Sequence, residues 1–172
     1  MTAPSAEQVI HLLGLEPHPE GGHFAELFRA PLAVTSAVHD GVRAASTAIY
    51  FLLKTGELSA LHRVRSDEVW HHYAGDALDL HAFSDAGHVR YRLGNDLARG
   101  ERPLAVIPAG VWQAARVEDV VCDAPGISHG YALCGCTVAP GFDFIDFELP
   151  SREAMLAKLS AHAEWVRALT RP

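Results

Sequence analysis

Short apolar or alternating segments, each ended by turn-forming residues, follow one another along most of this 172-residue chain. The segments are Phe24–Phe28, Thr47–Leu53, Val69–Tyr73, Leu78–Phe83, Val89–Leu93, Leu104–Ile107, Trp112–Val117, Tyr131–Val138 and Phe142–Leu149. Evenly spaced short strands of this kind are typical of an all-β sandwich or barrel. No repeat, low-complexity tract or linker divides them, so we expect a single domain over residues 1–172 with its barrel at about 20–150.

Helix signals occur only at the two ends of the chain. Ser5 and Gln8 form a capping-box pattern, and Gly14 can end the short helix that they begin. Ser151 can cap a longer helix that runs to about Thr170. The apolar face of this second helix is formed by Met155, Leu159, Val166 and Leu169. The sequence therefore predicts an antiparallel β-barrel with a short N-terminal helix and a longer C-terminal helix packed outside.

Charge and composition exclude several classes of partner. The formal net charge of −7 disfavours nucleic acid and anionic membrane surfaces. No stretch has the length of a membrane span, and the N-terminus lacks the basic start and apolar core of a signal peptide. The cysteines are odd in number and lack a Cys-x-x-Cys spacing; they are Cys122, Cys134 and Cys136. We expect a cytoplasmic protein with reduced, mostly buried thiols.

Gly56, His62, Glu68 and Gly75 occur at a fixed spacing in the middle of the chain. The run resembles the first signature of the cupins, in which two histidines and a glutamate are metal ligands inside a small β-barrel. One position departs from that signature, because Val64 stands where the second histidine belongs.

A second segment resembles the other cupin signature less closely. Pro108-Ala-Gly110 matches its Pro-x-Gly turn, but Gln113 replaces the histidine that follows and Val117 replaces the final asparagine. The opening glycine of the signature is Arg102 here, with Gly100 displaced by two residues.

Several longer strings are similar to one family of small single-domain cupins of unassigned function. They are Pro17-His-Pro-Glu-Gly-Gly22-x-Phe24-x-Glu26, Thr47-Ala-Ile-Tyr50-Phe-Leu-Leu53, His62-Arg63, Ser66-Asp-Glu68-Val-Trp-His71, Pro108-Ala-Gly-Val-Trp-Gln113 and Cys136-Thr-Val-Ala-Pro-Gly-Phe-Asp143-Phe-x-Asp-Phe-Glu148. The family is similar in fold to the sugar-nucleotide epimerases of the rhamnose pathway, which work as homodimers without metal. The resemblance implies a jelly-roll barrel and a homodimer, for which the segment Gly22–Arg29 is a candidate interface strand. It implies no established reaction.

Residues two apart in a strand face the same way, and this rule gives a candidate site. The side chains expected in the barrel interior are His62, Glu68, Trp70, His72 and Gln113, with Tyr50 at the wall and Asp143 as a further candidate. His71 and Tyr73 are expected on the opposite face. The pattern leaves open which of His62, His71 and His72 is functional.

One interpretation of this site is a metal centre. His62 and Glu68 remain from the four ligands of a full cupin site, which suits a divalent transition metal. Gln113 could be a third ligand through its amide oxygen, and His72 could swing in as a replacement. Val64 contributes no donor and a neutral amide is a poorer ligand than imidazole, so we expect no tightly held metal or other cofactor.

The other interpretation is acid–base chemistry without metal. His62 oriented by Glu68 could take a proton from a carbon beside a carbonyl, and Tyr50 or Tyr73 could return one. Two further side chains, Trp70 and Trp112, could form a flat wall for a sugar or aromatic ring. Arg63 could hold a phosphate or carboxylate only from a rim or dimer position, because its parity turns it away from His62.

These alternatives give three hypotheses for function. The leading one is an isomerase- or epimerase-like enzyme that acts on a small carbohydrate-derived or carboxylated metabolite by His/Glu proton transfer. The others are a non-catalytic module that binds a small molecule and a metal-dependent cupin enzyme. A purely structural role for the histidine–glutamate pair is a further alternative, because buried polar groups need partners in any case.

Overall fold

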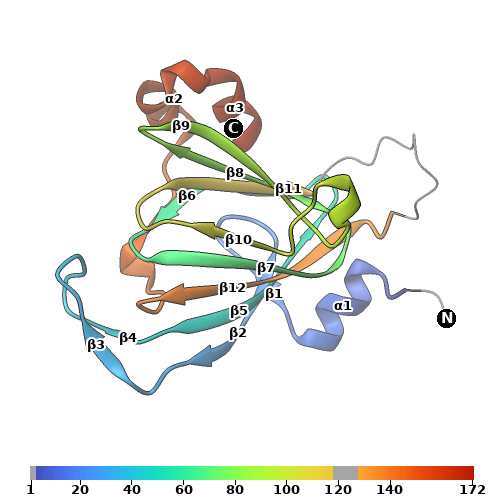
Figure 1. Ribbon diagram of the computed structural model, residues 1–172, viewed down its shortest axis with the longest axis horizontal. Coiled ribbons are helices and arrows are strands. Elements are labelled where there is room, and N and C mark those ends of the chain that lie inside the picture. Colours follow the sequence, from blue (N-terminus) through green and yellow to red (C-terminus); the bar gives the residue numbers. More distant parts are fainter. Residues whose placement is uncertain (1–2, 118–127) are drawn as a thin grey trace.

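Two antiparallel sheets face each other in a computed structural model that describes residues 3–117 and 128–172 (Figure 1). The first sheet has the strand order β1 (Glu16–Pro17), β2 (His23–Arg29), β5 (Thr47–Lys54), β12 (Tyr131–Ala139), β7 (Asp67–Gly75) and β10 (Leu104–Ile107). The second has the order β13 (Phe147–Glu148), β6 (Leu58–Val64), β11 (Trp112–Val117), β8 (Leu78–Ser84) and β9 (Gly87–Leu93). This arrangement confirms the predicted jelly-roll β-barrel.

Alternating side chains of the strands form the core between the sheets. Leu78, Leu80 and Ala82 of β8 point inward, while His81 and Phe83 point to the opposite face. The inner cluster also contains Cys134 and Cys136, which are both buried and free, as expected; Cys122 lies outside the described residues.

The N-terminal helix α1 (Ala6–Leu13) packs against the outer face of the first sheet. Ser5 and Gln8 form the expected capping box, and Gly14 ends the helix in the left-handed conformation. Leu52 and Tyr131 meet the helix from the sheet, and Tyr50 packs at the edge of the same cluster. Both sides of the middle of β5 are therefore covered.

The long C-terminal helix expected over residues 151–170 is interrupted. The structure has α2 (Arg152–Lys158), a 3₁₀ turn η3 (Ser160–His162) and α3 (Ala163–Leu169), all on the outer face of the second sheet (Figure 1). Arg152 donates to the side chain and the carbonyl of Thr170 at 3.0 and 2.6 Å, so the start of α2 is tied to the end of α3. This contact requires the chain to fold back, and the helix breaks at Leu159.

The expected strand over Phe142–Leu149 is also mostly absent. Phe144–Asp146 forms the 3₁₀ turn η2, and only β13 is extended. Asp143 caps this turn by accepting from the backbone N–H of Ile145. Asp146 is held by Arg43 through two hydrogen bonds of 2.6 and 3.0 Å, and both side chains are buried. Arg43 belongs to the hairpin β3 (Ala33–Thr35) and β4 (Val42–Ala44), which the sequence did not predict.

Apolar side chains remain exposed on the outer face of the first sheet. Those at least 45% exposed on this face are Phe28, Tyr73, Leu104 and Val106, from β2, β7 and β10. None of the helices in the described ranges is long and apolar enough to cross a membrane.

Candidate functional site

A cavity of about 210 Å³ lies between the sheets at one end of the barrel. The strands β2, β5, β6, β7 and β12 form its walls, and two connecting segments close it: the loop between β1 and β2, and residues 142–147. Its lining contains both side chains on which the sequence hypothesis depends, His62 and Glu68. The two therefore share one face of the barrel, as predicted.

His62 of β6 is buried, with 2% of its surface exposed. Its Nδ1 lies 2.8 Å from the carbonyl oxygen of Ala60. A carbonyl can only accept, so Nδ1 carries a proton and Nε2 has a lone pair when the ring is neutral. Burial lowers the pKa of His62, and the nearby charge of Glu68 opposes that shift. A neutral imidazole with an unprotonated Nε2 is the form that can accept a proton.

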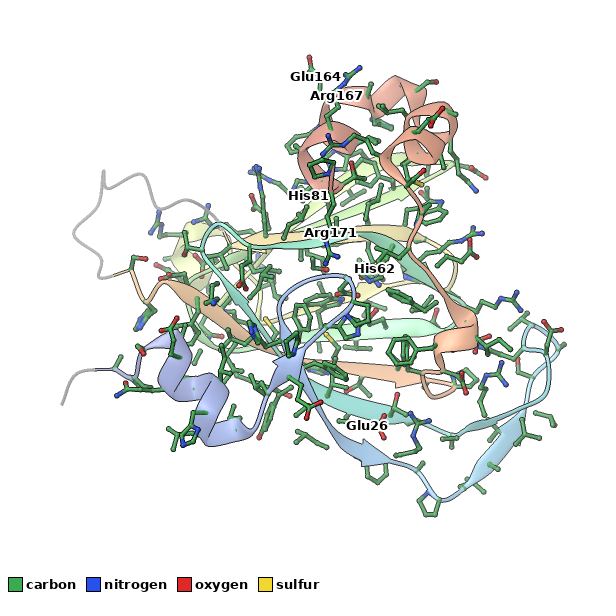
Figure 2. The ribbon with its side chains drawn as sticks, turned by 180° about the vertical axis from the view of Figure 1, so that it is seen from behind. Glu26, His62, His81, Glu164, Arg167 and Arg171 are labelled. Atoms are coloured by element: carbon green, nitrogen blue, oxygen red, sulfur yellow. The ribbon has the colours of Figure 1, made fainter. Side chains whose placement is uncertain are left out.

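Glu20, from the loop between β1 and β2, lies opposite this nitrogen. Its Oε2 is 3.3 Å from His62 Nε2, and its Oε1 accepts from the hydroxyl of Ser59 at 2.8 Å. The backbone N–H of Ala60 donates to the Glu20 carbonyl, which fixes the loop on β6 (Figure 2). Burial raises the pKa of Glu20, although the charges of His18 and Arg171 oppose this. The raised pKa favours a protonated carboxyl that faces the His62 lone pair.

Glu68 of β7 is held by a chain of hydrogen bonds. The indole N–H of Trp70 donates to Gln113 Oε1 at 3.0 Å, and Gln113 Nε2 donates to Glu68 Oε2 at 2.5 Å. An indole can only donate, so this chain fixes the orientation of the Gln113 amide. Burial raises the pKa of Glu68, and the charge of His62 and the bond from Gln113 act in the opposite direction. Gln113 and Trp70 therefore position Glu68 and do not line the cavity.

Aromatic side chains make up much of the remaining wall. They are His18, Phe24, Phe51, Phe142, Phe144 and Phe147. The ring of His18 lies 4.7 Å from that of Phe24, and the ring of His62 lies 5.5 Å from that of Phe147. At the rim, Arg29 pairs with Glu26 at 2.6 Å and donates to the carbonyl of Phe142 at 3.1 Å.

Two residues expected at the wall of the site, Tyr50 and Trp112, lie elsewhere. Tyr50 was placed at the wall, but Thr47, Ile49 and Phe51 face the cavity and Tyr50 therefore faces the outside of β5. Its ring lies at the same outer face as that of Tyr73, 6.1 Å away.

Trp112 adjoins Gln113 in β11 and so points to the opposite face. It packs beneath the C-terminal helices, with Arg63 4.5 Å from its ring. Arg63 also pairs with Glu148, as its outward parity predicted.

The remaining candidates lie inside or at the edge of the barrel. His72 is buried as predicted, but it contacts the carbonyl of Asp76 at 3.0 Å and does not line the cavity. Asp143 does line the cavity, at its exposed edge. His71 stacks on Tyr73 on the outer face, so of the three histidines left open only His62 reaches the cavity.

The residues present do not fit the metal set that the fold family implies. Gln113 Oε1 is occupied by the Trp70 N–H, and Val64 adds no donor. Within residues 3–117 and 128–172, no three or more His, Cys, Asp or Glu side chains are arranged to hold a metal ion. The expected absence of a tightly held metal stays a prediction, and elemental analysis of the purified protein tests it.

Sequence reasoning missed Glu20 and His18. Both lie in Pro17-His-Pro-Glu-Gly-Gly22, which the sequence offered only as part of the family resemblance. The glycines are required: Gly21 has φ +115°, and a Cβ there would lie 2.0 Å from the Leu58 carbonyl oxygen. The available signal was a glutamate in an otherwise apolar and glycine-rich turn.

Two solved structures resemble this chain along its whole length. A hypothetical protein from Leishmania major is 32% identical with a TM-score of 0.89, and the match covers 98% of this chain and 100% of that one. A protein from Shewanella oneidensis is 38% identical with a TM-score of 0.86, and the match covers 99% of both chains.

A more distant match shows the fold alone. Oxalate decarboxylase from Bacillus subtilis is 15% identical with a TM-score of 0.53, over 89% of this chain and 36% of that one. No functionally curated protein matches the sequence. The model of one family, described as Cupin superfamily (DUF985), matches residues 7–150, and the chain therefore belongs to this family of cupins.

Proposed function

We propose that this cupin is an isomerase- or epimerase-like enzyme in which His62 moves a proton at a carbon beside a carbonyl. The observation that carries the proposal is the pairing of His62 Nε2 with Glu20 Oε2 at 3.3 Å, at the buried wall of the cavity. Buried acid–base pairs with shifted pKa values are concentrated at functional sites.

The pair supplies a base and an acid at once. His62 Nε2 takes the proton from the substrate carbon, and the Glu20 carboxyl gives its proton to the carbonyl oxygen, which produces an enol. The protein is then left with an imidazolium beside a carboxylate. Return of the imidazolium proton to the other face of the same carbon, with return of the enol proton to Glu20, gives the epimer and restores the neutral pair. With a hydroxyketone or hydroxyaldehyde the intermediate is an enediol: Glu20 then takes the proton from the second hydroxyl and His62 protonates the former carbonyl carbon, which gives the isomer.

Glu68 stabilises the charged state of this cycle. When its carboxyl is ionised, its charge favours the protonated form of His62, and Gln113 holds the carboxyl in place through its N–H. The catalytic roles expected of His62 and Glu68 are kept in this proposal, whereas Glu20 takes the second role that the sequence hypothesis gave to Tyr50.

A non-catalytic binding module is the second candidate, because most of the cavity wall is apolar and such walls suit simple ligand binding. A deuterium-exchange experiment distinguishes the enzyme from the binding module. Small ketones, aldehydes and hydroxyketones are incubated with the protein in D₂O, and the loss of the α-proton signal is followed by NMR.

We expect exchange with the wild type, loss of exchange in His62→Asn, and no change in His71→Asn, which lies on the outer face of the same barrel. Asparagine at position 62 retains a donor for the Ala60 carbonyl but cannot act as the base. If probes bind and none of them exchanges, the binding module is the better interpretation.

A further inference from the structure

The charges around the cavity are unbalanced. Among the described residues that line it there are four carboxyl groups and one arginine, besides the two histidines. The carboxyl groups belong to Glu20, Glu26, Glu68 and Asp143. An anionic ligand would therefore meet several groups of its own sign or would have to force them to stay protonated.

The single arginine does not compensate for this excess. Arg29 pairs with both carboxylate oxygens of Glu26, at 3.0 and 2.6 Å, and a third N–H donates to the carbonyl of Phe142. Its charge is thus matched at the rim, while Glu20 and Glu68 lie in the buried part of the cavity. A carboxylate or phosphate taken into that part would lose water without gaining a free cation from the cavity lining, because Arg171, whose charge acts on Glu20, does not line the cavity.

The walls offer flat apolar surfaces. Five phenylalanines line the cavity, and Ile49, Val64 and Val138 fill the spaces between them. The deep polar groups tend toward their neutral forms, because burial raises the pKa of Glu20 and Glu68 and lowers that of His62. Neutral carboxyl and imidazole groups exchange hydrogen bonds with an uncharged oxygen.

From these contacts we infer that the ligand of this cavity is a compact, uncharged ring compound with one carbonyl or similar oxygen at its inner end. The ring lies among the phenylalanines, and the oxygen faces Glu20 and His62. This inference rests on the proposed function only for the carbonyl; the ring and the lack of charge come from the walls. It replaces the carbohydrate-derived or carboxylated metabolite that the sequence suggested.

The test uses three probes of equal shape and different charge: benzamide, benzoate and benzamidine. Binding to the wild-type protein at pH 7.5 is measured by ligand-observed NMR and by calorimetry. We expect benzamide to bind, and benzoate to bind on the order of tenfold more weakly or not at all, since one unmatched charge is sufficient for a factor of that size. Benzoate binding as tightly as benzamide, benzamidine binding more tightly than both, or no binding of any probe would each overturn the inference.

Variants show whether the probe occupies this cavity. Val64→Phe and Ile49→Phe fill it from two strands and should abolish benzamide binding, whereas Val89→Phe, at a half-exposed position of β9, should not. Glu26→Gln frees Arg29 and should strengthen benzoate binding several-fold with little effect on benzamide. Benzamide binding that survives both filling variants in folded protein, or benzoate binding unchanged in Glu26→Gln, would contradict the proposed location and charge.

These experiments measure binding, so they can contradict the proposed ligand class without contradicting the proposed reaction. His62→Asn should still bind benzamide, because the phenylalanine walls are intact. Benzamide binding without deuterium exchange of any ketone would refute the proton transfer and leave the ligand class standing. Deuterium exchange that occurs only with anionic substrates would refute the uncharged ligand class and leave the proton transfer standing.

Discussion

His81 predicts a specific loss of stability in acid. The side chain is fully buried between β8 and α3, where its ring lies 4.7 Å from that of Trp165 (Figure 2). Its Nδ1 is 3.0 Å from Nε2 of His88, and its own Nε2 has no hydrogen-bond partner within the described ranges. Burial lowers the pKa of His81 from 6.5 to about 3, and the neighbouring charges of His88, Arg116 and Arg90 act in the same direction.

The sign and size of the effect follow from proton linkage. Between pH 6.5 and 3 the unfolded chain binds a proton at His81 and the folded chain does not, so the free energy of unfolding falls as the pH is lowered through this range. The slope for one such group is about 1.4 kcal/mol per pH unit. At pH 4.5, two units below the ordinary value, His81 should therefore reduce stability by about 2 to 3 kcal/mol relative to neutral pH.

Urea unfolding followed by tryptophan fluorescence, at several pH values between 7.5 and 4.5, measures this contribution. His81→Phe keeps an aromatic ring against Trp165 and cannot be protonated, and His81→Leu serves the same comparison if the first variant folds poorly. The difference in free energy of unfolding between wild type and variant should shift by about 2 to 3 kcal/mol over this range, in favour of the variant at low pH. Leu12→Gln, at an exposed position of α1 that carries no titratable group, should show no such shift.

The reasoning fails if the wild type and His81→Phe lose stability in parallel on acidification. It also fails if the variant loses more. Titratable groups that do not contact His81, such as Glu20 and Glu68 with their raised pKa values, are common to both proteins and cancel in the difference.

Three further predictions concern the loops and the outer face. In urea unfolding, Gly21→Ala should destabilise the protein by about 1 to 3 kcal/mol more than Gly87→Ala. The two φ angles are nearly equal, +115° and +114°, but only at Gly21 would the new Cβ clash with a carbonyl oxygen. Asp146→Asn should lower the free energy of unfolding by about 3 kcal/mol, since it leaves the buried Arg43 guanidinium without its charge partner. Phe28→Arg should turn the expected homodimer into a monomer in light scattering, because it places a charge on the exposed apolar face of the first sheet, within the candidate interface segment Gly22–Arg29.

Each of these three predictions has a control and a result that would contradict it. Equal losses in the two glycine variants would show that the backbone angle alone matters. Asp40→Asn removes an exposed partner of Arg65 and should change stability by less than about 1 kcal/mol; an equal effect of Asp146→Asn would contradict the buried pairing. A wild-type protein that is already monomeric at micromolar concentration would refute the dimer.

The barrel could be predicted from the sequence because strand formation depends on local alternation and turn residues. The C-terminal break at Leu159 could not, since it depends on the contact between Arg152 and Thr170, which are 18 residues apart. Trp112 and Gln113 show a different error. Adjacent strand residues face opposite sides, so the rule that placed Gln113 inside should have placed Trp112 outside.

The location of Glu20 depends on contacts that no local pattern contains. Its carbonyl bonds to Ala60 and its carboxyl to Ser59, which are about 40 residues further along the chain. The long string that ends at Glu148 was recognised as family-specific, but its role as a cavity wall depends on the anchoring of Asp146 by Arg43. The sequence alone does not show whether the carboxylates of Glu20 and Asp146 lie in water or in the core.

The signature residues and the family strings therefore have different roles in this site. His62 and Glu68 occupy positions where other cupins hold a metal, but Gln113 bonds to Glu68 and Trp70 bonds to Gln113, so the carboxyl is restrained by the core. The segments outside the signatures supply what a metal centre would not need: Glu20 opposite His62, and the aromatic walls. The buried carboxyl of Glu20 lies 3.3 Å from Nε2 of the remaining histidine, and this alignment is the geometry that the proposed proton transfer requires.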